Sequence, residues 1–158
     1  VAILLTHGHF DHVMAVDSVR AAYHIPVYAA EAEKETMQDA SINLSINMGG
    51  AMLSIEADHW LKDGETITLL DQEVRCILTP GHTVGGMCFY FPKAGMLFSG
   101  DTLFQESVGR TDFPGGSMSE IVRSIREKLF VLPDAVQVYP GHGLMTSIKM
   151  KRCLIHLR

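Results

Sequence analysis

The stretch THGHFDH, near the start of the chain, carries four side chains that commonly bind metal ions: His7, His9, Asp11 and His12. Imidazole nitrogens and carboxylate oxygens, with no thiolate among them, suit Zn, Fe or Mn. Three more residues of the same kinds occur downstream, His82 in PGHT, Asp101 in SGD and His142 in PGHG. The sequence therefore contains seven candidate metal ligands.

Seven such ligands are enough for two ions, with one carboxylate shared between them. In sites with two metal ions, a bridging water becomes hydroxide near neutral pH and attacks a polarised carbonyl or phosphoryl group. Hydrolysis is therefore the reaction that this ligand set favours. Glycines flank several of the candidates, for example Gly8, Gly81 and Gly141, where the backbone must turn sharply or approach a metal closely.

A short apolar run leads into each of the four motifs. VAILL, at residues 1–5, is typical of a strand buried on both faces, and it ends at the histidine loop. ILTPGHT, LFSGD and VYPGHG have the same form. If these strands lie in one layered sheet system, their ends meet at one edge. The seven side chains are then expected to converge there.

Three helices are predicted between the strands. Apolar residues recur every three positions over 11–24, and the Glu and Lys residues of 30–39 are expected to form a solvated helix face. The segment 117–130 should begin with a capping box, in which Ser117 is the N-cap and Glu120 reaches back to it.

The remaining segments indicate a loop and a hairpin. SINLSINMGGAM, at 41–52, is expected to be a loop. The alternating segment 63–79 predicts a hairpin that turns around Asp71 and Gln72. Two further strands, GMCFYF and GMLFSGD, should be joined by the turn PKAG.

Composition limits the classes of protein to consider. The 158 residues are 47% hydrophobic and 20% charged, which is typical of one globular domain over residues 1–158. No run approaches the roughly 18 apolar residues that a membrane helix needs. A net charge of -5 without a basic stripe gives no sign of a nucleic-acid surface. We expect a small-molecule substrate and neither nucleic acid nor membrane as a partner; the oligomeric state stays open.

The three cysteines, Cys76, Cys88 and Cys153, form no C-x-x-C pair, and their odd number argues against a disulfide framework, so a cytoplasmic location is expected. Cys88 lies within a predicted strand and should be a core residue. The other three histidines, His24, His59 and His156, lack the glycine-flanked setting and are interpreted as surface or capping groups.

The motifs THGHFDH, PGHTVGG, SGDTLF and YPGHG resemble, in the same order, those of the metallo-β-lactamase-fold hydrolases. This resemblance implies an α/β fold, a four-layer αββα sandwich with a metal site at one edge of its two sheets. It implies a first metal held by His7, His9 and His82, a second held by Asp11, His12 and His142, and a bridging Asp101. The two carboxylates, Asp11 and Asp101, are then the expected catalytic residues.

The block GRTDF resembles the branch that contains hydroxyacylglutathione hydrolase (glyoxalase II) and its single-domain bacterial relatives. This branch implies hydrolysis of a thioester such as S-acylglutathione by metal-bound hydroxide. Two divalent ions are expected, zinc first, with iron or manganese as alternatives. A basic residue near Arg110 contacts substrate in glyoxalase-like members, but Arg110 could equally pair with Asp112 to brace its own loop.

Two alternative functions are considered. A persulfide dioxygenase-like enzyme would use a single iron and would not need Asp11 and His12, and its last motif usually has Ala in place of Gly141. The other alternative is an inactive, metal-binding remnant. Full family members have several strands, on the order of fifty residues, before the histidine motif, so the domain is expected to be N-terminally incomplete. The C-terminal KMKRCLIHLR is expected to diverge from the family pattern.

Two other members of the superfamily are disfavoured. A lactamase of the Cys-ligand type is disfavoured because Asp101 occupies the bridging position. Nuclease members carry a long insertion between the third and fourth motifs, whereas only 40 residues separate Asp101 from His142.

Overall fold

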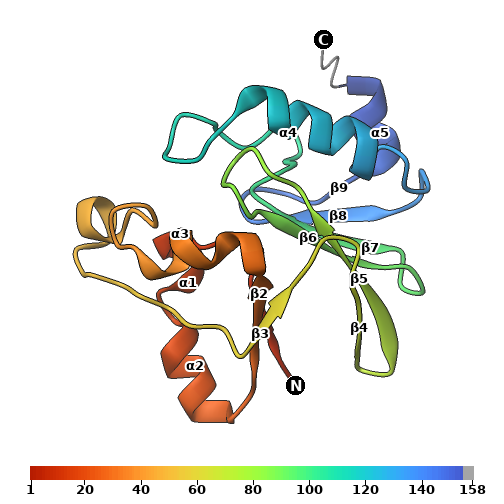
Figure 1. Cartoon of the computed structure of the whole chain (residues 1–158). Helices are drawn as coiled ribbons and strands as arrows, with labels where there is room; N and C mark the ends of the chain where they lie inside the picture. The colour runs from red at the N-terminus through yellow and green to blue at the C-terminus, as the bar shows by residue number, and fades with distance from the viewer. Residues whose placement is uncertain (155–158) are drawn as a thin grey trace.

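Two β-sheets with helices on their outer sides form the protein in the computed structural model, which describes residues 1–154 (Figure 1). The first sheet has three parallel strands, in the order β1 (Ile3–Leu4), β2 (Val27–Ala30) and β3 (His59–Leu61). The second has six, in the order β4 (Thr66–Leu69), β5 (Gln72–Leu78), β6 (Met87–Phe91), β7 (Met96–Gly100), β8 (Gln137–Pro140) and β9 (Thr146–Ser147). This α/β sandwich is the fold that the sequence predicts.

The strand directions of the larger sheet determine where its polar motifs lie. β4, β5, β6 and β7 are antiparallel to one another in turn, whereas β7 and β8 are parallel. Parallel neighbours need a crossover connection. Here the crossover includes α4 (Met118–Ser124) and the π-helical turn η3 (Ile125–Leu129). As a result, β7 and β8 end at the same edge, and Asp101 and His142 follow those ends.

The predicted helix over 11–24 is in fact two helices, α1 (Phe10–Val13) and α2 (Val16–Tyr23). Val13 and Val16 are both buried, so the apolar spacing continues through the break and conceals it. The C-cap of α2 is His24, which has a left-handed backbone with φ 51°. The capping interpretation of His24 is therefore confirmed.

The predicted helix over 30–39 consists of a 3-10 turn, η1 (Glu31–Glu33), followed by α3 (Lys34–Gln38). The expectation of a solvated face was wrong for one acidic residue, because Glu33 is only 1% exposed. Its carboxylate accepts backbone hydrogen bonds from two loops, and these bonds compensate for its burial.

The expected loop over 41–52 contains one π-helical turn, η2 (Ser45–Gly49). The hairpin over 63–79 is confirmed as β4 and β5, but its central turn residues are Leu70 and Asp71, one position earlier than predicted. Both have positive φ angles, 52° and 56°, as the common two-residue hairpin turn requires.

Half of the predicted capping box is present at the start of α4. The Ser117 hydroxyl accepts a hydrogen bond from the Glu120 N–H at 3.4 Å. The expected return bond is wrong, because the Ser117 N–H donates to the carbonyl of Gly81 and the Glu120 side chain pairs with Arg123. The carbonyl of Gly81, which follows β5, therefore accepts the Ser117 N–H that the Glu120 side chain would have accepted in a complete capping box.

The sequence did not predict the last two described elements, β9 and α5 (Ile148–Leu154). β9 pairs antiparallel with β8, and Ile148 at the start of α5 is fully buried. The segment assigned to a divergent tail begins at residue 149, just after Ile148, and it forms the rest of α5 as far as residue 154. Residues 155–158, with His156, lie outside the described part.

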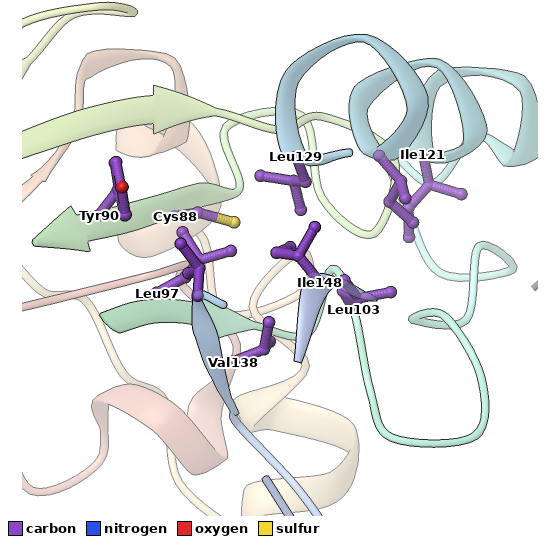
Figure 2. Close-up of a cluster of buried hydrophobic side chains, with 10 residues drawn as sticks. Cys88, Tyr90, Leu97, Leu103, Ile121, Leu129, Val138 and Ile148 are labelled. Atoms are coloured by element: carbon purple, nitrogen blue, oxygen red, sulfur yellow. The ribbon is translucent and has the colours of Figure 1, made fainter. Parts of the chain in front are cut away.

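Two apolar clusters form the core around the larger sheet. Figure 2 shows the cluster between this sheet and the helices α4 and α5, which contains Cys88, Tyr90, Leu97, Leu103, Ile121, Ile125, Leu129, Val136, Val138 and Ile148. The predicted core position of Cys88 is confirmed. A second cluster joins the two sheets and consists of Ala30, Leu61, Val74, Cys76, Met87 and Phe89. No helix within residues 1–154 has both the length and the apolar content to cross a bilayer.

Two identical substitutions test this core. Val138 is 0% exposed, whereas Val131 is 69% exposed. Val138→Ala should lower the free energy of unfolding by about 2 kcal/mol, because it removes buried methyl groups and leaves a cavity. Val131→Ala should change it by less than about 0.5 kcal/mol. Denaturant titration measures both, and equal losses would contradict this description of the core.

Candidate metal centre

The seven candidate ligands lie in segments that follow strand ends, five of them on loops and two in the short helix α1, and the structure brings them together. The loop after β1 carries His7 and His9, α1 carries Asp11 and His12, and the ends of β5, β7 and β8 lead to His82, Asp101 and His142. Ligand atoms within 4.8 Å of one another form three groups: His7, His9 and His82; His7, His12 and Asp101; and Asp11, His12 and His142.

Asp101 lies between the two outer groups. Its Oδ2 is 3.6 Å from His82 Nε2 and 3.5 Å from His142 Nε2, and its Oδ1 is 3.4 Å from His12 Nε2. Within the groups, His9 Nδ1 is 3.0 Å from His82 Nε2, and His12 Nε2 is 3.2 Å from His142 Nε2. One carboxylate therefore adjoins both sets of imidazole nitrogens.

The two sets differ in burial. His7, His9 and His82 are 2%, 3% and 4% exposed. In the other set, the side chains of Asp11 and His142 are 40% and 57% exposed. A cation in the first set would be enclosed by protein, whereas one in the second set would face the solvent.

The protonation of the buried set suits a metal ion. Burial lowers the pKa of His7 well below its ordinary value and lowers that of His9 to about 4, so both are neutral at neutral pH. Neutral imidazole is the form that binds metals. Burial also raises the pKa of Asp101, although the neighbouring histidines oppose this shift. Burial therefore disfavours the charged form of each of these groups.

Three polar atoms of this cluster lack a hydrogen-bond partner among the described residues: His7 Nε2, His9 Nε2 and Asp101 Oδ1. Buried acceptors without partners cost free energy, on the order of 1–3 kcal/mol each. A divalent cation would interact favourably with lone pairs of this kind. The residues present therefore fit the metal that the sequence predicts.

Backbone hydrogen bonds fix the loops around the site. His82 Nδ1 lies 2.8 Å from the Arg110 carbonyl oxygen, so a proton on Nδ1 donates there and leaves Nε2 for the site. The Met87 N–H donates to the Thr6 carbonyl at 2.8 Å, which joins the end of β1 to the start of β6. The ligand loops of the two sheets are therefore held together directly.

Close packing explains why glycine precedes His142. A Cβ atom at Gly141 would overlap Asp101 Oδ1 and lie 2.8 Å from His12 Cε1. The alanine that persulfide dioxygenases usually have at this point would require the ligands to shift. Gly141 therefore fits the ligand arrangement in this structure and does not favour the dioxygenase alternative.

A pocket of about 450 Å³ opens beside the candidate ligands. Its lining includes five of them: His9, Asp11, His82, Asp101 and His142. Its apolar wall consists of Phe10, Leu44, Met48, Phe104, Val108 and Phe113. This wall was not predicted from the sequence, because its residues come from separate loops, and apolar residues within the polar segment 41–52 were the only signal. A larger hollow of about 850 Å³, beside α3, contains none of the seven ligands.

Arg110 also lines the pocket, and it pairs with Asp112. Its Nε and Nη2 each donate to the carboxylate at 2.7 Å, and its guanidinium carbon lies 4.1 Å from the centre of the Phe113 ring. The guanidinium lowers the pKa of Asp112 to about 2. Arg110 therefore has the bracing contact that its sequence position allowed, and its contact with substrate stays a prediction.

The other histidines and cysteines of residues 1–154 lie outside the cluster. His59 is exposed and stacks on Tyr28, with ring centres 4.4 Å apart. Cys76 and Cys88 are buried free thiols, and burial raises the pKa of each to about 11. A thiol with so high a pKa is protonated at neutral pH and is a poor metal ligand.

Comparison with known protein families shows which family the chain belongs to. Residues 1–142 match the family model described as "Metallo-beta-lactamase superfamily". The chain belongs to this superfamily.

Two curated relatives are similar over most of the chain. It is 40% identical over 149 residues to "Probable metallo-hydrolase YqgX" of Bacillus subtilis, and the aligned part covers 94% of this chain and 71% of the relative. It is 38% identical over 142 residues to "Probable polyketide biosynthesis zinc-dependent hydrolase BaeB" of Bacillus velezensis, and the aligned part covers 90% of this chain and 56% of the relative.

Three solved structures have the same fold. "BLEG-1 B3 metallo-beta-lactamase" is 40% identical with a TM-score of 0.91, over 97% of this chain and 74% of the other. "TTHA1623 in a di-iron-bound form" is 33% identical with a TM-score of 0.85, over 99% and 77%. "ETHE1 from Myxococcus xanthus" is 25% identical with a TM-score of 0.78, over 98% and 60%.

The ligand cluster should make the stability of the protein depend on divalent metal. Addition of zinc at about 100 times its dissociation constant should stabilise the protein by about 2.7 kcal/mol. His7→Ala should remove most of this effect, because His7 belongs to two of the ligand groups. His59→Ala is the matched control and should keep it. Melting curves with and without metal measure the shift, and an unchanged shift in His7→Ala would disprove the assignment of this ligand.

Proposed function

We propose that the protein is a metal-dependent hydrolase with two divalent ions that cleaves a small thioester such as S-acylglutathione. The observation that carries this proposal is the convergence of two ligand sets on Asp101, which lines a pocket with an apolar wall. Under this proposal His7, His9 and His82 hold one ion, and Asp11, His12 and His142 hold the other.

Relatives support the metal assignment. TTHA1623 was crystallised in a di-iron-bound form, and BaeB is described as a zinc-dependent hydrolase. The site contains imidazole and carboxylate but no thiolate, a donor set that suits both metals. We propose zinc, with iron or manganese as the alternatives.

When bound, a pair of divalent ions lowers the pKa of a shared water and polarises the carbonyl that it attacks. The side chains of the protein position the water and the substrate. Asp101 adjoins both ligand sets and is only 10% exposed at its side chain, so it can orient the attacking water without competition from solvent. Asp11 faces the pocket from the more exposed set.

The pocket suits a thioester with an apolar acyl group. Phe104, Val108 and Phe113 give it an apolar side next to the ligands. Arg110 adds a cation beside them, and its bonds to Asp112 use only two of its five N–H donors. We propose that the acyl group lies against the apolar wall and that Arg110 attracts an anionic group on the thiol side of the substrate.

A second candidate function is β-lactam hydrolysis. The chain is 40% identical to BLEG-1, a solved structure described as a B3 metallo-beta-lactamase. A β-lactam is also a strained carbonyl compound that a metal-activated water can open. A β-lactam should therefore be assayed beside the thioester.

The number of ions is tested by His12→Ala. His12 belongs to the more exposed set, and its loss should reduce the metal content from two ions to about one per chain and slow hydrolysis. Elemental analysis of reconstituted protein, freed of excess metal, measures the content. His59→Ala should retain both ions. Two ions in His12→Ala, with an unchanged rate, would show that the second site is wrongly assigned.

The separate roles of Asp101 and Arg110 are tested with an S-acylglutathione substrate. Asp101→Ala should lower kcat by about a hundredfold or more, because it removes a group shared by both ligand sets. Arg110→Ala should raise KM by about tenfold and change kcat little. Arg75→Ala is the matched control, since Arg75 is an exposed arginine paired with Glu73, two residues away, and it should change neither constant.

The outcomes of these assays separate the alternatives. Turnover of a β-lactam alone would favour the lactamase candidate. Oxygen consumption with glutathione persulfide, without thioester cleavage, would move the assignment to the dioxygenase. Bound metal without turnover of any of these substrates would support an inactive, metal-binding remnant.

A further inference from the structure

Glu33 is a buried acidic residue with no place among the seven ligands. It ends η1 and is only 1% exposed. Its Oε1 accepts a hydrogen bond from the Gly8 N–H at 2.9 Å, and its Oε2 accepts one from the Gly85 N–H at 2.7 Å. One carboxylate therefore joins two loops that are far apart in the sequence.

The two loops that Glu33 joins carry the buried ligand set. Gly8 lies between His7 and His9, and Gly85 lies three residues after His82. A shift of either N–H away from the carboxylate would move these imidazoles relative to one another. The carboxylate therefore holds together the two loops that carry the buried ligand set.

Close backbone packing makes this contact possible. A Cβ atom at Gly85 would overlap the backbone nitrogen of Glu33, and one at Gly8 would lie 2.8 Å from Met37 Cγ in α3. Glycine at both positions allows the loops to approach the segment 31–38 closely enough for their N–H groups to reach Glu33. The glycines and the glutamate thus form one packed unit.

We propose that Glu33 is a positioning residue of the metal centre, which holds the loops of His7, His9 and His82 in the geometry that binds one ion. The inference rests on the metal site of the proposed function, but not on its substrate. Carboxylates and carbonyls that hold the loops or rings of metal ligands contribute to affinity without touching the metal.

Glu33→Gln is the sharpest test, because the amide keeps the size of the side chain but turns one acceptor into a donor that faces a backbone N–H. Glu31→Gln is the matched control, since Glu31 lies on the same turn and is exposed. Competition with a chelator measures zinc affinity, and the visible spectrum of the cobalt-substituted protein reports ligand geometry. We expect Glu33→Gln to bind zinc about 10- to 100-fold more weakly, with a changed cobalt spectrum. The control should match the wild type.

An unchanged zinc affinity and cobalt spectrum in Glu33→Gln, with only a lower melting temperature, would show that Glu33 merely braces the fold and would overturn the proposal. Ile125→Val, in the core beyond the larger sheet, provides a destabilised reference and should keep the wild-type affinity and spectrum. Wild-type protein that binds no metal would instead refute the proposed function, and this inference with it.

Wild-type protein gives an independent test if the variant does not fold. With metal removed, the amides of Gly8 and Gly85 should exchange slowly with solvent in an NMR hydrogen-exchange experiment, because Glu33 holds both before the ion arrives. Rapid exchange of both amides in the metal-free protein, and protection only after metal is added, would mean that the ion organises the loops and would overturn the proposal.

Discussion

The burial of three histidines beside one carboxylate is the constraint on which the rest of the structure depends. His7, His9 and His82 are withdrawn from water and converge, and His7 Nε2 and His9 Nε2 have no hydrogen-bond partner among the described residues. Such an arrangement costs free energy unless a cation satisfies it. The fold must therefore hold these side chains in place.

Both sheets contribute to this arrangement. The first sheet provides the histidine loop, and the second provides the loops of His82, Asp101 and His142. An apolar cluster with residues from both sheets packs them together, and the hydrogen bond from Met87 to Thr6 joins them beside the site. The parallel pairing of β7 and β8 brings two further ligands to the same edge. Packing thus sets the approximate position of the ligands, and backbone hydrogen bonds refine it.

Much of the site can be predicted from the sequence, because ligand type and spacing are local. The sequence predicted that the candidate ligands in THGHFDH would meet His82, Asp101 and His142, and the structure brings the seven side chains together. The features that were missed depend on tertiary contacts. The pocket wall comes from loops that meet only in the fold, and Glu33 lies in a pattern of Glu and Lys that is typical of a solvated helix. Its burial follows from two backbone donors on other loops, which no local pattern reveals.

Under the proposed function, two ions lie side by side, one in each ligand set, with Asp101 between them. X-ray diffraction from crystals of the zinc-loaded protein, recorded at the zinc absorption edge, tests it most directly. We expect two anomalous peaks about 3.5–4 Å apart. One should lie among His7, His9 and His82, and the other among Asp11, His12 and His142. A single peak, or a peak that Asp101 does not adjoin, would contradict this claim.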